Sequence, residues 1–236
     1  MPTRVVGLDG DDTLWHSEGH YITTTERLGE LLAPYLDDDG SDLDHARAVQ
    51  HLTEVERRNL ARFGYGVKAF TLSMIETAVE VSGARVSASE IQRILDWSKE
   101  LLDHPVELIE GVEETIDRLA GSYQLLLVTK GDLLHQESKV ARSGLVERFE
   151  SVHIVSEKDP ATYNRVLAGT GVAPQEFVMV GNSVRSDVLP VLELGARAVH
   201  VPYHTTWALE TVEGELPAEA AHLDRIDELP EFLEST

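Results

Sequence analysis

The chain has 236 residues, enough for one or two domains with a hydrophobic core. Its 20 Lys and Arg residues against 42 Asp and Glu residues give a formal net charge of −22, which argues against nucleic acid or an anionic membrane surface as a partner. No cysteine is present, so disulfides, thiolate metal sites and cysteine nucleophiles are excluded. We see no secretory signal and no apolar run of membrane-spanning length, and we therefore expect a cytoplasmic protein.

Short apolar runs recur along the chain and are typical of strands buried on both faces of a parallel sheet. These runs are residues 5–8, 125–128, 152–155, 177–180 and 198–201. Helical patterns separate the later runs, including an apolar stripe over residues 112–120. The alternation of strand and helix predicts a doubly wound α/β domain with a parallel sheet.

The long segment between the first and second runs breaks this alternation, because it contains no convincing strand. We interpret residues 17–104 as an inserted unit of four helices, and residues 1–16 with 105–236 as the α/β core. Turn-forming residues are expected to separate the four helices near 37–41, 64–66 and 82–86.

Two capping boxes are predicted in this insert, since a Ser or Thr followed three residues later by Glu is typical of a helix start. One joins Thr23 to Glu26, and the other joins Ser87 to Glu90. At the other end of the chain, the acidic stretch from about Thr206 predicts a short terminal helix or a loose tail.

Polar residues follow the apolar runs, at the carboxyl ends of the predicted strands, where open parallel sheets bind their ligands. The residues after the first four of the five runs are Asp9, Asp11 and Thr13; Thr129, Lys130, Gly131 and Asp132; Ser156, Glu157, Lys158 and Asp159; and Gly181, Asn182, Ser183 and Asp187. Their oxygen donors and lysines fit a hard cation such as Mg²⁺ beside a phosphate. A cation would also relieve the repulsion among the carboxylates after the first run.

The same residues carry a resemblance to a known family. "DGDDT" at residues 9–13 matches the D-x-D-x-T signature of the haloacid dehalogenase (HAD) superfamily. Thr129 resembles the second motif of that family, Lys158 in "SEKDP" the third, and "GNSVRSD" the fourth. Because the motifs occur in the family's order, the chain resembles a HAD hydrolase of phosphatase type with a Rossmann-like core. The insert resembles the family's helical cap of the first class.

The resemblance implies a role for each matched residue. Asp9 would be the nucleophile that forms an aspartyl-phosphate, and Asp11 would be the general acid and later the base. Thr129 and Lys158 would take part in catalysis and bind the phosphate, with Lys130 beside them. The metal ligands would be Asp9, Asp11 through its backbone carbonyl, Asn182 and Asp187.

One residue departs from the family pattern. At the position of the first acid in the family's fourth motif, this chain has Asn182, whose amide oxygen ligates a hard cation without adding charge. We therefore expect weaker Mg²⁺ affinity than a fully acidic site would give. The second aspartate of the first motif, Asp11, favours phosphate chemistry over dehalogenation.

Ordinary structural roles stand as alternatives for four of these residues. They are Thr129 as the cap of a helix starting near Asp132, Lys130 as a solvated loop lysine, Lys158 as a surface residue before a helix, and Asp187 as the cap of the following helix.

The resulting prediction is a Mg²⁺-dependent phosphatase that acts on a small phosphorylated metabolite, with the helical insert selecting the substrate. The same motifs would serve a phosphotransferase or mutase, in which an organic hydroxyl replaces water as the acceptor. A phosphate- or metal-binding regulatory protein without turnover is a third possibility, and Asn182 is the feature that favours it.

Overall fold

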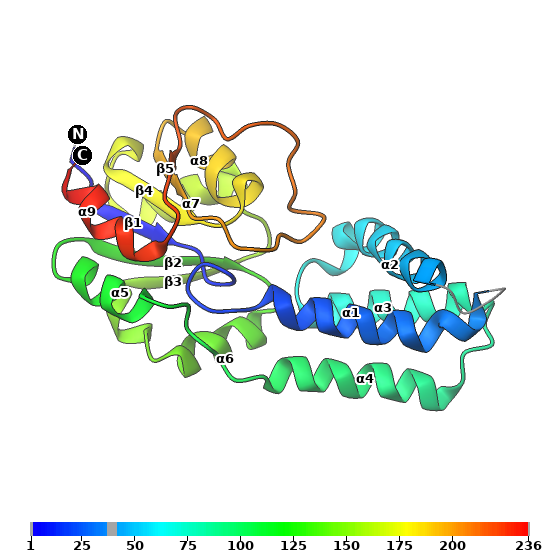
Figure 1. The fold of residues 1–236 in the computed structure, drawn as a ribbon. Helices are drawn as coiled ribbons and strands as arrows, with labels where there is room; N and C mark the ends of the chain where they lie inside the picture. Colours follow the sequence, from blue (N-terminus) through cyan, green and yellow to red (C-terminus); the bar gives the residue numbers. More distant parts are fainter. Residues whose placement is uncertain (1, 37–41, 236) are drawn as a thin grey trace. The chain divides into compact units, whose positions relative to one another are not determined.

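The computed structural model describes residues 2–36 and 42–235. It divides into two units: an α/β unit formed by Met1–Glu18 and Val106–Thr236, and a helical unit formed by Gly19–Pro105 (Figure 1). The turn expected at 37–41 lies outside the described residues. Over the described ranges, no helix combines the length and apolar content needed to cross a membrane.

The α/β unit is built on a six-stranded sheet in the order β3-β2-β1-β4-β5-β6. Its strands are β1 (Val5–Leu8), β2 (Gln124–Lys130), β3 (Ser151–Val155), β4 (Phe177–Gly181), β5 (Arg197–His200) and β6 (Ala221–His222). Every pair of neighbours is parallel, which confirms the predicted sheet. Strand β6 was not predicted, because a two-residue strand has no apolar run that marks it in the sequence.

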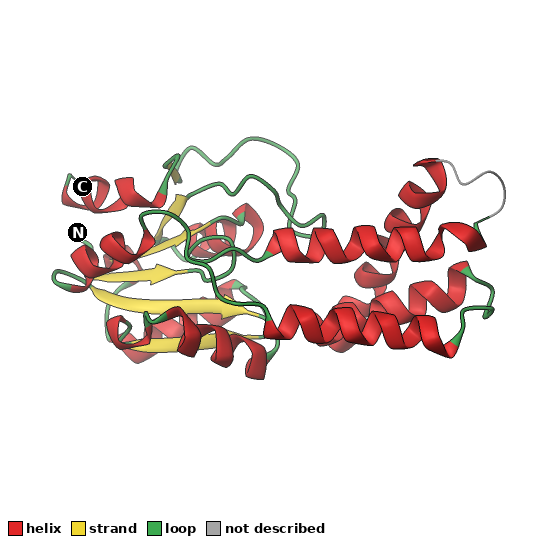
Figure 2. Ribbon diagram, turned by 60° about the horizontal axis from the view of Figure 1, so that its bottom comes forward, coloured by secondary structure: helices red, strands yellow, loops and turns green. Residues whose placement is uncertain are grey.

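Helices cover both faces of this sheet (Figure 2). One apolar cluster joins the sheet to α5 (Val112–Ala120), α6 (Leu133–Ser143) and α9 (Leu229–Glu234). A second cluster on the other face joins it to α7 (Pro160–Thr170) and α8 (Leu189–Glu193).

Neighbouring strand residues belong to different clusters, as strand geometry requires. Val6 packs in the first cluster and Val5 in the second, and both are fully buried. This continuous burial explains why the strands read as unbroken apolar runs, and the doubly wound architecture is confirmed.

Short helical turns connect the larger elements. They are η1 (Ala33–Tyr35), η2 (Val146–Arg148), η3 (Pro174–Glu176) and η5 (Ile226–Glu228), together with η4 (Val184–Val188), which has π-helical hydrogen bonding. Of the two alternatives for the stretch from about Thr206, the short terminal helix is present as α9, and β6 and η5 precede it.

The helical unit is formed by four helices of the described chain, and all four contribute to one apolar core. The first of them, α1, begins at Glu18. The four helices are α1 (Glu18–Leu32), α2 (Asp42–Phe63), α3 (Val67–Val81) and α4 (Ala88–Asp103). His20 and His104 lie at the two ends of this unit, and their ring centroids are 3.5 Å apart.

One of the two predicted capping boxes is confirmed. The Ser87 hydroxyl accepts the Glu90 backbone N–H at 3.2 Å, and the Glu90 carboxylate accepts the Ser87 N–H at 2.7 Å. The other was wrong, because Thr23 lies inside α1 and its hydroxyl donates to the Gly19 carbonyl at 3.0 Å.

Asp12 provides the cap that replaces the predicted one at the start of α1. Its carboxylate accepts the backbone N–H groups of Ser17 at 2.8 Å and Glu18 at 3.1 Å. Asp12 has a φ of 62°, a left-handed conformation that Asp tolerates better than most residues. The turn that follows β1 is therefore fixed by its own third aspartate.

Candidate active site

The sheet order brings the motifs to one place. Strand β1 lies between β2 and β4, with Leu8 paired to Leu127 on one side and to Val180 on the other. The residue after Leu8 is Asp9, so the ends of β2 and β4 flank it. Thr129 and Lys130 are the last two residues of β2 itself, whereas the sequence placed them just after the strand.

Lys158 joins two carboxylates at the centre of the site. Its Nζ donates to Asp9 Oδ1 at 2.5 Å and to Asp187 Oδ1 at 2.6 Å. All three residues are buried, with exposed fractions of 4%, 7% and 1% for Lys158, Asp9 and Asp187. This burial rules out the alternative of a surface lysine. The nearby helix α7 is capped by Asp159, which accepts the Thr162 N–H at 2.7 Å.

Burial and charge act against each other in this group. Burial raises the pKa of Asp9 to about 7, although Lys158 opposes the rise, and Asp187 adds to it. Burial lowers the pKa of Lys158, but Asp187 and Asp9 outweigh it, so the pKa lies above its ordinary value. Lys158 is therefore a permanent cation between the two carboxylates.

Asp187 is held close to the backbone by the turn after β4. Its Oδ2 accepts the Ser183 N–H at 3.0 Å. A Cβ on Gly181 would lie 2.2 Å from that oxygen, so only glycine fits there. The alternative that Asp187 caps the next helix is wrong, because its oxygens are taken by Lys158 and Ser183 while Val188 is the N-cap of α8.

Thr13 links the first motif to the fourth. Its Oγ1 lies 3.3 Å from Asp9 Oδ2 and 3.4 Å from Asn182 Oδ1, and it accepts the Asn182 N–H at 3.1 Å. The Asn182 carbonyl in turn lies 3.0 Å from Nε2 of His200, which donates to it. The amide oxygen of Asn182 and one oxygen of Asp9 thus face the same hydroxyl.

The side chain of Asp11 is directed to a different set of partners. It accepts hydrogen bonds from Trp15 Nε1 at 2.6 Å, Gln136 Nε2 at 2.8 Å and Lys139 Nζ at 2.7 Å. None of these three partners was predicted from the sequence. Gln136 and Lys139 are buried polar residues on α6, and their three-residue spacing on that helix was the available signal.

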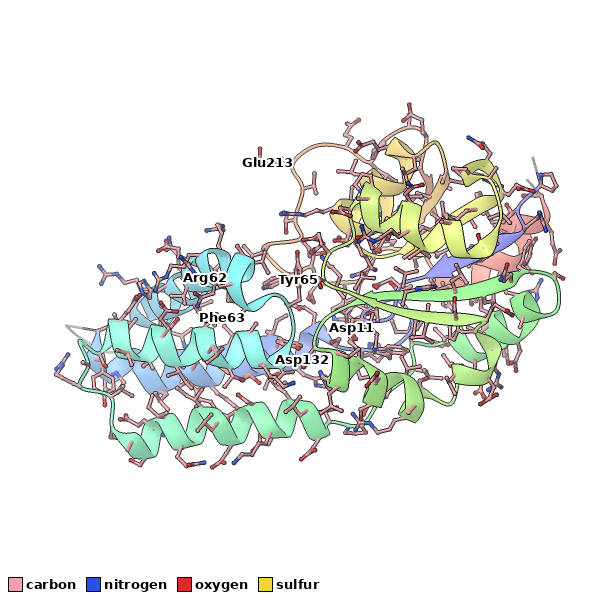
Figure 3. All side chains as sticks on the ribbon, turned by 180° about the vertical axis from the view of Figure 1, so that it is seen from behind. Asp11, Arg62, Phe63, Tyr65, Asp132 and Glu213 are labelled. Atoms are coloured by element: carbon pink, nitrogen blue, oxygen red, sulfur yellow. The ribbon has the colours of Figure 1, made fainter. Side chains whose placement is uncertain are left out.

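Three donors keep Asp11 ionised. Burial raises its pKa, but Lys139, Gln136 and Trp15 outweigh this, and the pKa lies below its ordinary value. The neighbouring Asp12 differs, because burial and the Asp11 charge raise its pKa to about 6. Figure 3 shows Asp11 in the loop after β1, near the start of α6 where Asp132 is labelled.

Thr129 and Lys130 have partners other than those expected. Thr129 is buried, and its hydroxyl accepts Gln136 Nε2 at 3.2 Å, while Asp132 and not Thr129 is the N-cap of α6. Lys130 Nζ donates to Glu210 Oε1 at 2.5 Å and to Ser186 Oγ at 2.8 Å. Only 12% of the Lys130 side chain is exposed, so it is not a solvated loop lysine. Its role toward a phosphate stays a prediction.

The donor set at this site fits a hard cation. Within residues 2–36 and 42–235, no group of three or more His, Cys, Asp and Glu side chains is arranged to hold a metal. The predicted set contains only Asp9 and Asp187 as side-chain carboxylates, and it is completed by the amide of Asn182 and the backbone carbonyl of Asp11. Oxygen donors of this kind, few in number, suit Mg²⁺, which commonly keeps several waters.

A family model and a solved structure that match this chain carry the same family description. A family model described as haloacid dehalogenase-like hydrolase matches residues 3–195. A crystal structure of a haloacid dehalogenase-like family hydrolase from Xanthomonas campestris is 43% identical with a TM-score of 0.85, over 99% of this chain and 91% of that one.

Two curated proteins match over shorter segments. Glyceraldehyde 3-phosphate phosphatase of Pyrococcus furiosus is 29% identical over 132 residues, 53% of each chain. N-acylneuraminate-9-phosphatase of Mus musculus is 26% identical over 149 residues, which are 59% of this chain and 56% of that one. The chain therefore spans about half the length of the curated relatives it matches.

Proposed function

The chain belongs to the haloacid dehalogenase-like hydrolases, and we propose that it is a phosphatase that hydrolyses a small phosphomonoester through an aspartyl-phosphate on Asp9. The observation that carries this proposal is the buried group in which Lys158 Nζ contacts both Asp9 and Asp187. A further carboxylate, that of Asp11, lies two residues after the nucleophile in the sequence. Two relatives that carry the name phosphatase support it.

In the first step, an oxygen of Asp9 attacks phosphorus and the bond to the leaving oxygen breaks. Lys158 keeps Asp9 in place and offsets the negative charge that gathers around it. Asp11, once protonated, gives its proton to the leaving oxygen. Because Lys139 favours the ionised form of Asp11, protonation has to accompany the loosening of that ion pair.

In the second step, water attacks the phosphorus of the aspartyl-phosphate. Asp11 is now a carboxylate and takes the proton from water, which releases phosphate and restores Asp9. The ionised Asp11 held by Trp15, Gln136 and Lys139 matches what this step requires.

Mg²⁺ would be held by Asp9, Asp187, Asn182 and the Asp11 carbonyl, and it would offset charge on the phosphoryl oxygens. Asn182 lowers the negative charge of this set. We expect Asn182→Asp to tighten Mg²⁺ binding by several fold in calorimetry, since an anionic ligand replaces a neutral one. Unchanged or weaker binding would contradict this assignment of Asn182.

The helical unit Gly19–Pro105 is proposed to act as the cap that selects the substrate, a small phosphorylated metabolite. A cytoplasmic location remains part of the proposal. The fold by itself does not decide the leaving group, because many activities share one architecture.

The test is phosphate release from a panel of phosphomonoesters and an aryl phosphate, with Mg²⁺ and with a chelator. We expect release that requires the metal and is lost in Asp9→Asn, with the fold intact by circular dichroism. Turnover that survives in Asp9→Asn would remove this residue from the nucleophile role. A phosphorylated acceptor in place of free phosphate would identify a transferase.

A further inference from the structure

A partly buried carboxylate outside the four motifs connects two of them. Glu210 lies in the segment between β5 and β6, and 12% of its side chain is exposed. Its Oε1 accepts Lys130 Nζ at 2.5 Å. Its Oε2 accepts the hydroxyls of Ser183 and Ser186, each at 2.5 Å. Both carboxylate oxygens are therefore engaged by groups of the candidate site.

These contacts cross the strand that carries the nucleophile. Lys130 ends β2, whereas Ser183 and Ser186 follow β4. Because β1 lies between β2 and β4, Glu210 joins the two strands that flank Asp9. A single side chain thus spans the sheet edge from the second motif to the fourth.

The fourth motif is also held at a second point by the same segment. Arg185 Nη1 donates to the Leu209 carbonyl at 2.8 Å, one residue before Glu210. Ser183 follows Asn182 in sequence, and its backbone N–H binds Asp187 at 3.0 Å. Displacing Ser183 would therefore move both side-chain ligands that the fourth motif offers to a metal.

We propose that Glu210 is a positioning residue of the active site. Its carboxylate fixes Lys130 and the Ser183–Ser186 turn relative to each other, and so holds Asn182 and Asp187 in place around Asp9. This inference rests on the proposed function for its effect on turnover, whereas its effect on Mg²⁺ binding can be measured without turnover. Glu210 does not need to touch the substrate.

The test compares Glu210→Gln with Glu213→Gln, a matched change at an exposed residue of the same segment (Figure 3). Glutamine keeps the size of Glu210 and removes the charge that binds Lys130. We expect kcat for an aryl phosphate to fall about tenfold to a hundredfold, because small displacements near reacting atoms have effects of this size. The change in KM should be much smaller, and the Kd for Mg²⁺ by calorimetry should rise several fold.

Glu213→Gln should leave all of these quantities unchanged. Glu210→Asp should recover part of the loss, since it restores the charge with a shorter reach. A Glu210→Gln protein that has a lower melting temperature but the parent's kcat and Mg²⁺ Kd would overturn the proposal, because the residue would then stabilise the fold without positioning the site.

Two further results keep the test decisive. If Glu210→Gln does not fold, Ser186→Ala removes one of the same contacts and is measured in the same way, with the same expected direction and the same overturning result. If the parent protein releases phosphate from no substrate, the proposed function fails. Equal Mg²⁺ affinity in Glu210→Gln and Glu213→Gln would then overturn the positioning role separately.

Discussion

Two buried lysines neutralise carboxylates after β1, and they do so with different partners. Lys158 lies between Asp9 and Asp187, so one cation serves two anions. Among the described residues Lys139 forms an ion pair with one carboxylate, that of Asp11, and Gln136 and Trp15 supply further hydrogen bonds to it. The surroundings of the two aspartates therefore differ in charge balance although they are two residues apart.

This difference separates two chemical tasks. Burial raises the pKa of Asp9 to about 7, whereas Lys139 and the neutral donors hold the pKa of Asp11 below its ordinary value despite burial. The proposed nucleophile Asp9 thus depends for its ionised form on a cation that it shares with Asp187. The proposed acid–base residue Asp11 has a cation of its own and two neutral hydrogen-bond donors. Substitutions of the two lysines test this contrast.

The largest effect is expected for Lys158→Met. Removing the shared cation leaves two buried carboxylates next to each other, and breaking a buried pair in this way lowers the free energy of unfolding by about 3–5 kcal/mol. Phosphate release should be lost. Denaturant unfolding and a phosphate assay measure the two effects.

Lys99→Met provides the control for Lys158→Met. Lys99 pairs with Asp96 on the surface of the helical unit, with 64% of its side chain exposed. Exposed pairs contribute little to stability, so this change should be nearly silent. Equal effects of the two substitutions would show that the burial of Lys158 is unimportant.

A smaller effect is expected for Lys139→Met. Asp11 keeps its bonds to Trp15 and Gln136, and 29% of its side chain is exposed, so unfolding should become easier by about 2–3 kcal/mol. Its pKa should rise, because the positive charge is gone. A carboxyl ¹³C NMR titration should place the midpoint of Asp11 at higher pH in Lys139→Met than in the parent. Equal midpoints would show that Lys139 does not control the ionisation of Asp11.

The smallest effect concerns His135, a buried residue of α6 one helical turn before Lys139. Burial, together with the positive charge of Lys139, lowers its pKa to about 4. The unfolded chain therefore takes up a proton first as the pH falls. The stabilising contribution of neutral His135 is complete above its ordinary pKa of about 6.5 and is lost as the pH falls towards 4.

Urea unfolding at pH 7 and pH 5 measures this contribution. The loss of unfolding free energy between the two values should be smaller in His135→Gln than in the parent by about 1–2 kcal/mol. Asp12, with its pKa raised to about 6, titrates in the opposite direction in both proteins, so the difference between them isolates His135. Identical pH dependence in the two proteins would contradict a buried neutral histidine.

The contrast also marks what the sequence could predict. Asp9, Lys158, Asn182 and Asp187 follow apolar runs that are recognisable as strands, and parallel strands bring their carboxyl ends together, so their proximity was predictable. Their chemical roles remain predictions.

Lys139 and Glu210 do not follow an apolar run, and the three-residue spacing from Gln136 was the weak signal that Lys139 offered. Lys139 is a lysine on an otherwise ordinary amphipathic helix, and Glu210 lies in a segment without regular structure, 80 residues from its partner Lys130. Contacts of this kind depend on how a helix or loop packs against the sheet, which periodicity does not encode. The misplaced helix start at Thr23 has a similar origin, because the cap comes from Asp12, five residues before Ser17.

The contact between His20 and His104 bears on how such a fold can carry an insert at all. Strands β1 and β2 are hydrogen-bonded neighbours, yet Gly19–Pro105 separates them along the chain. Closing a flexible loop costs only about 0.6 kcal/mol more for each doubling of its length. A folded insert whose two ends bring the ring centroids of His20 and His104 to 3.5 Å reduces even that, because it presents its entry and exit side by side. Once the helical unit has folded, the loop between β1 and β2 behaves entropically as if it held only residues 9–18 and 106–123.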